Sequence, residues 1–361
     1  MSELVIAGFT AIIVLMTVAP LSRSSRWWIR GLDFPRLQIC AAGLLLLVVQ
    51  LSLLDLSEFP EQLMPVATVA CLIYQAWWIL PYLRPYPNEV RMTPAPADSD
   101  RVRILSSNVL MTNRNADALI ALVRQHQPDI LVTLETDAWW QSRLDVLESD
   151  YPHTIKCPLE NTYGMHVYSK LPLEDAETQF LVQPDVPSMH AMAILRSGQP
   201  VRMHFLHPAP PSPTENDEST ERDAELLVVA KSVVTVPGPL VVAGDLNDVG
   251  WSATTRLFRK ISGLLDPRVG RGMFNTFHAG HWFIRWPLDH LFHSRHFTLS
   301  FMQRLPSVGS DHFPVLVELV HDAAAGARQH GLTADADDRQ IADEKIAKEP
   351  VRPSDVHEPE V

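Results

Sequence analysis

The chain has 361 residues, 46% of them hydrophobic, and a formal net charge of −12. Proteins that bind duplex nucleic acid through its phosphates are usually basic, so this acidic balance disfavours that class. The three cysteines, Cys40, Cys71 and Cys157, are too few and too scattered for a disulfide framework or a cysteine zinc site.

Three apolar segments come first, at about residues 3–21, 37–56 and 62–83. Each is close to the roughly 20 residues that a helix needs to cross the hydrocarbon core. The first lacks the basic start and the small-residue cleavage site of a signal peptide. Buried helices of a soluble domain are the alternative, but three such segments in a row disfavour it. We therefore predict a membrane domain over residues 1–83 with three transmembrane helices, in a multi-pass protein of the inner (cell) membrane.

The charges of the connecting loops predict an orientation. The second loop, "DLSEFPE", holds acids and no Lys or Arg, whereas the first loop and the segment after the third span are basic. The positive-inside rule then places the C-terminal region in the cytoplasm. The periplasmic or extracellular side stays open as the alternative, because one misassigned span reverses the result. The basic residues are Arg23, Arg26, Arg30, Arg36, Arg84, Arg91, Arg101 and Arg103.

The remaining chain divides by composition into three parts. Residues 84–100 are Pro-rich and polar and predict a linker. Residues 321–361 are rich in Ala, Asp, Glu and Lys without an apolar period, and predict a disordered acidic tail. Residues 101–320 alternate short apolar runs such as "VRILSSNVL" with helical patterns such as "STERDAELLVVAKSVV". Many strands with few helices indicate a two-sheet α/β sandwich.

Polar residues recur at the predicted strand ends of this domain. Singly, each is most simply a cap or a turn residue, but together they are acids, amides and histidines that could converge at one rim. Hard oxygen ligands of this sort suit Mg²⁺, with Mn²⁺ as an alternative. A Gly-rich phosphate loop and a G-x-S-x-G elbow are both absent from the sequence. The strand-end residues are Asn108, Glu135, His207, Asp245, Asn247, Asp289, His290, Asp311 and His312.

The motif order "N…E…H…GDLN…LDH…SDH" resembles the endonuclease/exonuclease/phosphatase superfamily, and "GDLN" and "SDH" are its most specific pieces here. The resemblance implies a DNase-like, four-layered α/β sandwich and metal-dependent phosphoester hydrolysis. One departure is Leu110, where some relatives carry a second acid. The resemblance implies metal ligation by Glu135, Asn108 and Asp311, and catalytic roles for Asp245, Asn247, His207, His312 and Asp289.

Two further expectations concern the site. Asp289 should hydrogen-bond His312 and favour its charged form, because a nearby carboxylate raises the pKa of a histidine. Asn161 and Tyr163, in "NTYGMHVYSKLPL", together with Trp251 and His290, are predicted to contact substrate. A plain hairpin with a tight glycine turn is the alternative for the first pair. For Trp251, and for Trp282 as a second rim residue, the alternative is the core.

These observations predict a membrane-anchored phosphoesterase acting on a phosphoester or pyrophosphate of a lipid-linked substrate. A nuclease acting on nucleic acid phosphodiesters is the alternative, disfavoured by the acidic domain. A non-catalytic membrane-tethered scaffold is the alternative from another class, and degenerate members of that kind should have lost Asp245, His312 or Glu135. No segment indicates a protein partner.

Overall fold

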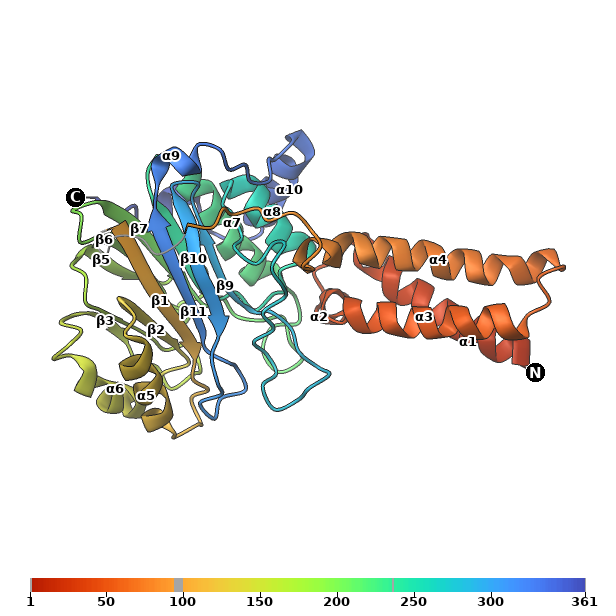
Figure 1. The fold of residues 1–361 in the computed structure, drawn as a ribbon, viewed down its shortest axis with the longest axis horizontal. Helices are drawn as coiled ribbons and strands as arrows, with labels where there is room; N and C mark the ends of the chain where they lie inside the picture. The colour runs from red at the N-terminus through yellow and green to blue at the C-terminus, as the bar shows by residue number, and fades with distance from the viewer. Residues whose placement is uncertain (1, 94–99, 236, 361) are drawn as a thin grey trace.

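The structure, a computed structural model, describes residues 2–93, 100–235 and 237–360. A stalk of helices (residues 2–82) projects from one side of an α/β domain (residues 100–235 and 237–360), as Figure 1 shows. The N-terminus lies near the far end of the stalk and the C-terminus on the opposite side of the domain.

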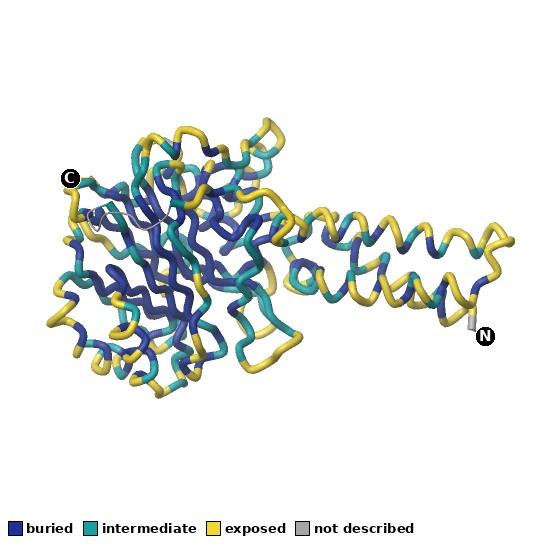
Figure 2. The backbone as a smooth tube through the Cα atoms, in the orientation of Figure 1, coloured by how far each residue is buried: buried dark blue, intermediate teal, exposed yellow. Residues whose placement is uncertain are grey.

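The stalk contains three helices long and apolar enough to cross a membrane. Their candidate spans are between 28% and 33% buried, so most of their apolar surface faces outward (Figure 2). That distribution suits helices that contact lipid rather than a protein core. The candidate spans are Glu3–Ser22, Arg36–Leu53 and Phe59–Tyr82. The helices are α1 (Ser2–Val18), α2 (Trp27–Arg30), α3 (Arg36–Leu53) and α4 (Phe59–Ile79).

The interior of the stalk is held partly by neutral hydrogen bonds. The Nε2 atom of Gln50 donates to Oγ1 of Thr10 at 2.8 Å and to Oγ1 of Thr68 at 3.0 Å. Seven residues after Thr68 in α4, Nε2 of Gln75 donates to Oγ1 of Thr17 at 3.1 Å. Polar side chains inside a bundle of apolar helices are expected to pair across the helices in this way.

The α/β domain is built on two sheets, ordered β10-β11-β1-β2-β4-β3 and β5-β6-β7-β8-β9. β1 and β2 are parallel, as are β7 and β8, and the other neighbouring pairs are antiparallel. The strands are β1 (Arg101–Asn108), β2 (Ile130–Leu134), β3 (His153–Cys157), β4 (Met165–Ser169), β5 (Leu173–Gln179), β6 (Ser188–Ile194), β7 (Pro200–Leu206), β8 (Leu240–Asp245), β9 (Asp289–His293), β10 (Phe297–Arg304) and β11 (Val315–His321).

Helices cover the outer faces of both sheets. In β1, Val102 and Ile104 join the core between the sheets, while Leu105 packs with Trp140 under the helices of the first sheet. Alternation of this kind follows from the period of two along a strand. With a helix layer on each sheet, the domain is the expected four-layered α/β sandwich. The helices are α5 (Ala116–His126) and α6 (Ala138–Leu144) on the first sheet, and α7 (Thr220–Thr235) and α8 (Ala253–Ser262) on the second, followed by α9 (Ala323–Gly326) and α10 (Ala336–Ile346).

The predicted linker is not a free tether where the structure describes it. Val90 is fully buried in the core between the sheets. The backbone of Leu299 in β10 donates to the carbonyl of Arg91 at 2.8 Å and accepts from Thr93 at 3.0 Å. The proline-rich, polar composition of this segment gives no sign in the sequence that Met92 pairs with Leu299 of β10. Residues 94–99 of the predicted linker lie outside the described residues.

The prediction of a disordered tail over residues 321–361 is wrong. Within it, α10 is capped by Asp335, whose side chain accepts from the backbone of Asp338 at 2.9 Å. Ala342 and Ile346 are buried against α7 and α8. The acids of the tail are compensated by basic residues elsewhere: Asp338 pairs with Lys260 of α8 at 2.7 Å. The charges of one segment do not show which basic side chains of other segments will pair with its acids.

Candidate active site

Most of the predicted site residues meet at one rim of the sandwich because five strands end or begin there. Asn108 ends β1 and lies opposite Leu134, so Glu135 follows directly beyond the parallel strand β2. In the second sheet, Asp245 at the end of β8 pairs with Asp289 at the start of β9. β11 runs antiparallel to β1, so Asp311 and His312 just before it reach the same rim.

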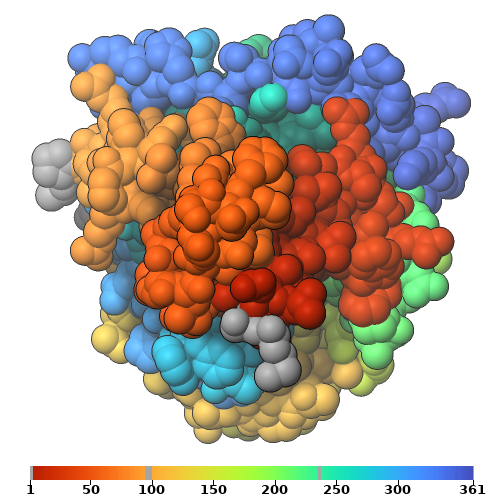
Figure 3. All heavy atoms as spheres, turned by 90° about the vertical axis from the view of Figure 1, so that its right-hand side faces the viewer, coloured from red at the N-terminus to blue at the C-terminus, as the bar shows by residue number. Residues whose placement is uncertain are grey.

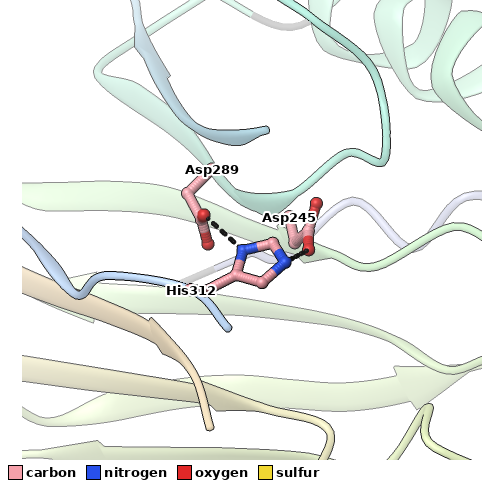
Figure 4. Close-up of side chains that lie close together, drawn as sticks. All are labelled: Asp245, Asp289 and His312. Carbon is pink, nitrogen blue, oxygen red and sulfur yellow. Dashed lines mark hydrogen bonds and ion pairs between the residues drawn. The ribbon is translucent and has the colours of Figure 1, made fainter. Parts of the chain in front are cut away.

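His312 lies between two carboxylates, as Figure 4 shows. Its Nδ1–H donates to Oδ2 of Asp289 at 2.8 Å, and its Nε2 lies 3.5 Å from Oδ2 of Asp245. Burial alone would lower the pKa of His312, but the two carboxylates outweigh it and raise the pKa to about 10. The predicted Asp289–His312 hydrogen bond is confirmed, and the imidazole is cationic at neutral pH.

Asn108 joins the two sheets through its side-chain amide. Its Nδ2 donates to Oε1 of Glu135 at 2.7 Å and to Oδ2 of Asp245 at 3.1 Å. Burial raises the pKa of Glu135 to about 7, and the Asn108 hydrogen bond and the His312 charge only partly offset that burial. Glu135 has a φ of +60°, a costly backbone conformation for a residue other than glycine, as sites with a functional constraint often show.

The "GDLN" segment owes its shape to close strand contact. A Cβ on Gly244 would lie 1.9 Å from the carbonyl oxygen of Leu206 in β7, so only glycine fits there. Asn247 donates its backbone N–H to Oδ1 of Asp245 at 2.9 Å and its Nδ2 to the carbonyl of Pro208 at 3.0 Å. These bonds fix the side chain of Asn247 next to Asp245.

His207 differs from His312 in charge. It is 2% exposed, and burial lowers its pKa to about 4, although Asp245 opposes that shift. Its Nδ1 has no hydrogen-bond partner in the described part of the chain. A neutral imidazole with an unused ring nitrogen is suited to contact a substrate oxygen. By contrast, His312 and His207 hold the pKa of Asp245 below its ordinary value against the effect of burial.

A pocket of about 300 Å³ opens over these residues. Its polar wall includes Glu135, His207, Asn247, Asp311 and His312. The rest of its wall is largely apolar or aromatic and comes from distant parts of the chain. These further lining residues include Phe34, Tyr163, Pro210, Pro211, Phe277 and Leu288.

The donor set fits a divalent metal ion. Asp245, Asp289 and His312 place ligand atoms within 4.8 Å of one another, close enough to share an ion. Nδ1 of His312 is already committed to Asp289, however. Among the described residues Glu135 uses only Oε1 in hydrogen bonds, and Asp311 lines the same pocket. Buried hard oxygen donors with one uncommitted carboxylate oxygen are what a divalent cation such as Mg²⁺ requires.

Three of the four predicted substrate contacts do not line the pocket, and two of these, Trp251 and His290, are buried elsewhere. Trp251 is 2% exposed, packs on Tyr82 and donates Nε1–H to the carbonyl of Asp33 at 2.9 Å. His290 is also 2% exposed, and its ring nitrogens contact Arg268 and the carbonyl of Asp248 at 2.7 and 2.8 Å. Both side chains point into packed interior rather than into the pocket. For His290 in β9 the reason is that successive residues of a strand face opposite sides, so it points away from the side that Asp289 faces.

The "NTYG" loop contributes one residue directly. Tyr163 lines the pocket and its hydroxyl bonds to Glu215, whereas Asn161 does not line it. Asn161 instead accepts the Tyr163 N–H at 3.1 Å and donates to the carbonyl of Asp185 at 2.8 Å. Asn161 therefore fixes the position of Tyr163. Trp282, the other expected rim residue, is 83% exposed and is not part of the pocket wall.

Phe34 and Phe277 were missed at the sequence level. Phe34 lies between the first two apolar segments, 67 residues before β1 begins at Arg101, and no periodic signal connects it to the site. Phe277 lies in "FNTFHAGHWFIRW", where the high aromatic content was the one visible sign of a functional loop.

Comparison with known proteins agrees with this geometry. A family model described as "Endonuclease/Exonuclease/phosphatase family" matches residues 105–312, a range that includes Asn108 and His312. No curated protein is similar enough in sequence to match.

Three solved structures illustrate the shared fold. The human Nocturnin catalytic domain with bound sulfate anion is 16% identical, with a TM-score of 0.51, over 63% of this chain and 96% of that one. D. rerio TDP2 complexed with single strand DNA product is 16% identical, with a TM-score of 0.50, over 61% and 98%. An endonuclease/exonuclease/phosphatase from Beutenbergia cavernae DSM 12333 is 16% identical, with a TM-score of 0.50, over 62% and 72%. Identities this low establish the fold alone.

Proposed function

The chain belongs to the endonuclease/exonuclease/phosphatase family of hydrolases that act on phosphoester bonds, and from that premise we propose a membrane-anchored, Mg²⁺-dependent phosphoesterase of a lipid-linked phosphoester or pyrophosphate. The observation that supports a lipid-linked substrate is the position of Phe34. This residue belongs to the loop between the first two candidate membrane spans, yet it forms part of the wall of the catalytic pocket. The pocket therefore opens where the stalk meets the domain.

A row of aromatic rings connects that loop with the catalytic histidine. Phe34 packs edge-on against Trp286 with ring centroids 5.6 Å apart, and Trp286 stacks on Phe277 at 6.2 Å. Phe277 in turn lies 5.0 Å from the ring of His312. An apolar wall of this kind suits the hydrocarbon next to a lipid phosphate and offers little to the sugar–phosphate backbone of DNA.

The loop that carries Phe277 also reaches the base of the stalk. Gln38, in the first turn of α3, donates Nε2–H to the carbonyl of Phe283 at 2.8 Å. Phe283 and its neighbour Trp282 are 54% and 83% exposed. Exposed aromatic residues at the level where a span begins favour contact with the membrane–water interface.

The residues of the pocket divide the work of hydrolysis. Glu135, Asn108 and Asp311 would hold the divalent ion, which supplies positive charge against the phosphate oxygens. Asp245 accepts a proton from the attacking water, and Asn247 fixes the direction of that water. The imidazolium of His312 stabilises the negative charge that develops on phosphate, and Asp289 holds its orientation. His207, neutral at pH 7, contacts a phosphate oxygen.

Substrate preference of the full chain tests the proposal. In detergent micelles, hydrolysis of a polyprenyl pyrophosphate and of phosphatidic acid is compared with cleavage of plasmid and single-stranded DNA, with and without Mg²⁺. We expect Mg²⁺-dependent release of phosphate from a lipid substrate and no cleavage of DNA. Efficient DNA cleavage without lipid turnover would establish the nuclease alternative instead.

Phe34→Ala refines the same test. Removing the ring deletes apolar contact with lipid but leaves the polar wall intact, so the KM for the lipid substrate should rise about tenfold. Turnover of a water-soluble phosphodiester should change less than about twofold. Phe180→Ala is the matched control, because Phe180 is 45% exposed beyond β5 and does not line the pocket. An equal loss on both substrates would show that Phe34 supports the fold rather than the lipid.

A further inference from the structure

A second pocket lies at the base of the stalk, on the other side of the loop that carries Phe34. Its volume is about 290 Å³, near the lower end of the range for small-molecule sites. Asp33 lines this pocket while the next residue, Phe34, lines the catalytic one. Figure 3 looks along the stalk onto this junction, where the surface around α8 is recessed between the stalk and the C-terminal segment.

The second pocket is basic in a chain that is acidic overall. Its wall includes two carboxylates, Asp33 and Asp338, and six cationic side chains. The whole chain, by contrast, has a formal net charge of −12. The cationic residues are Arg23, Arg30, Arg36, Arg256, Lys260 and Lys345.

Ion pairs inside the protein do not neutralise this charge. Lys260 pairs with Asp338 at 2.7 Å, and Lys345 pairs with Asp223 at 2.6 Å. Arg30 and Arg36, however, share the single carboxylate of Asp33.

Two further arginines add to the excess. In the described part of the chain, no carboxylate forms an ion pair with Arg23 or Arg256. The guanidinium of Arg256 lies 5.8 Å from the ring centroid of Trp78, and that of Arg36 lies 4.9 Å from the same ring. Two positive charges therefore lie beside one indole, and an anion in the pocket would reduce their mutual repulsion.

Unused donors point to the same ligand chemistry. Arg30 and Arg36 are 6% and 1% exposed, and the Nε atom of each has no hydrogen-bond partner among the described residues. A buried donor without an acceptor costs free energy, and the cost is larger for a charged group. Phosphate oxygens, like carboxylate oxygens, fit the planar guanidinium.

The position of the pocket identifies where such a phosphate comes from. Pro20 and Leu21 of the wall end the first candidate span, Arg36 begins the second, and Tyr74 and Trp78 occupy the last two turns of α4. Trp and Tyr at the end of a span mark the level of lipid head groups. Basic pockets between helices at that level recognise anionic head groups.

We propose that this pocket binds the phosphate head group of an anionic phospholipid and so fixes the α/β domain against the bilayer. The wall is completed by Lys260 of α8 and by Asp338 and Lys345 of α10, so the C-terminal segment has a role in lipid contact. The site is separate from the catalytic pocket and does not depend on the proposed substrate.

Lipid binding by the full-length protein tests the proposal. The detergent-solubilised chain is titrated with phosphatidylglycerol or phosphatidylcholine of equal chain length, and bound lipid is counted by native mass spectrometry. A basic side chain near anionic lipid contributes about 1 kcal/mol, so R23Q/R256Q should weaken phosphatidylglycerol binding roughly thirtyfold. R84Q/R91Q removes the same charge from exposed positions outside the pocket and should change phosphatidylglycerol binding less than about twofold. R23K/R256K should retain most of the binding.

Three outcomes would overturn the proposal. Equal weakening in R23Q/R256Q and R84Q/R91Q would mean that only general surface charge attracts lipid. Displacement of phosphatidylglycerol by an equal concentration of inorganic phosphate would make the pocket a site for free phosphate. Loss of both lipid binding and soluble-phosphodiester turnover in R23Q/R256Q and R23K/R256K alike would place the two arginines in the catalytic machinery. Failure of the chain to hydrolyse lipid phosphates would leave this binding measurement unaffected.

Discussion

Neutral polar residues join the long helices of the stalk, whereas the rim of the α/β domain buries charged ones. In the stalk, Gln50 and Gln75 are neutral and bond to threonines of neighbouring helices. At the rim of the domain, buried groups are charged or incompletely paired: Oδ1 of Asp289 and Nδ1 of His207 have no partner among the described residues. Hydrogen bonds between neutral side chains hold the helices together, whereas the unpaired atoms of Asp289 and His207 keep bonding capacity for a ligand. Function is therefore concentrated at the domain rim and at the base of the stalk.

The largest effect expected within this comparison is that of metal removal. Chelation with EDTA should reduce hydrolysis of a soluble phosphodiester to background, because the buried carboxylates otherwise repel an anionic substrate. Added Mg²⁺ should restore activity, and the stalk, which has no part in the chemistry, should keep its helical content throughout. Full activity after exhaustive chelation would show that hydrolysis does not require a metal ion.

Asp245→Asn should have the next largest effect. The substitution keeps the shape of the side chain but abolishes its ability to accept a proton, so kcat should fall about 10²–10⁴-fold. Asp343→Asn is the control, because Asp343 is an exposed acid on α10 that pairs with Lys231 and does not line the pocket. A kcat within about threefold of the wild type would exclude Asp245 as the base.

Asp289→Asn tests the support of His312 and should cost less than loss of Asp245. The amide removes the negative charge that favours the imidazolium, while the side chain still fills its place beside Nδ1. We expect kcat to fall about 10–100-fold with little change in KM. An unchanged kcat would contradict the proposed role of the Asp289–His312 pair.

Glu225 of α7 offers a measurement on the domain away from the site. It is 2% exposed, and burial raises its pKa from 4.5 to about 8. Below about pH 4.5 both the folded and the unfolded state carry the proton; between 4.5 and 8 only the unfolded state loses it, so stability falls as pH rises through this window. Glu225→Gln should abolish that fall and raise the melting temperature at pH 8.5. Glu344→Gln, at an exposed position of α10, is the control and should leave the pH dependence of the wild type unchanged.

The smallest effect should come from the stalk interior. Gln50→Leu removes two neutral hydrogen bonds across the helices, each of which contributes on average about 0.6 kcal/mol inside a membrane. Catalysis on a soluble substrate should be unaffected. Loss of turnover on that substrate would show that the bundle transmits its packing to the active site.

Sequence alone was sufficient for the sandwich fold, the three apolar helices and the order of the site motifs, because each depends on local pattern, but it did not indicate β3, β5 or β10. "GDLN" and "SDH" lie at strand ends that the sheet topology brings together. The sequence could not show that Phe34 joins the catalytic wall, because that contact depends on how the stalk docks on the domain. It also could not separate buried His290 from pocket-lining His312, since both follow an aspartate at a strand boundary. The ion pair between Lys260 of α8 and Asp338 of α10 could not be predicted either, because it depends on how these two helices pack.

The most direct test of the central claim uses lipid substrate in the same bilayer as the enzyme. The full chain is reconstituted in vesicles that contain a polyprenyl pyrophosphate, and the rate of phosphate release is measured. In the comparison, enzyme and substrate are in separate vesicles: substrate vesicles without enzyme are mixed with enzyme vesicles without substrate. In the proposed arrangement the stalk confines pocket and substrate to one surface, so release within the same bilayer should be faster by at least about tenfold. Equal rates in the two arrangements, or cleavage of added DNA without release of lipid phosphate, would contradict the account.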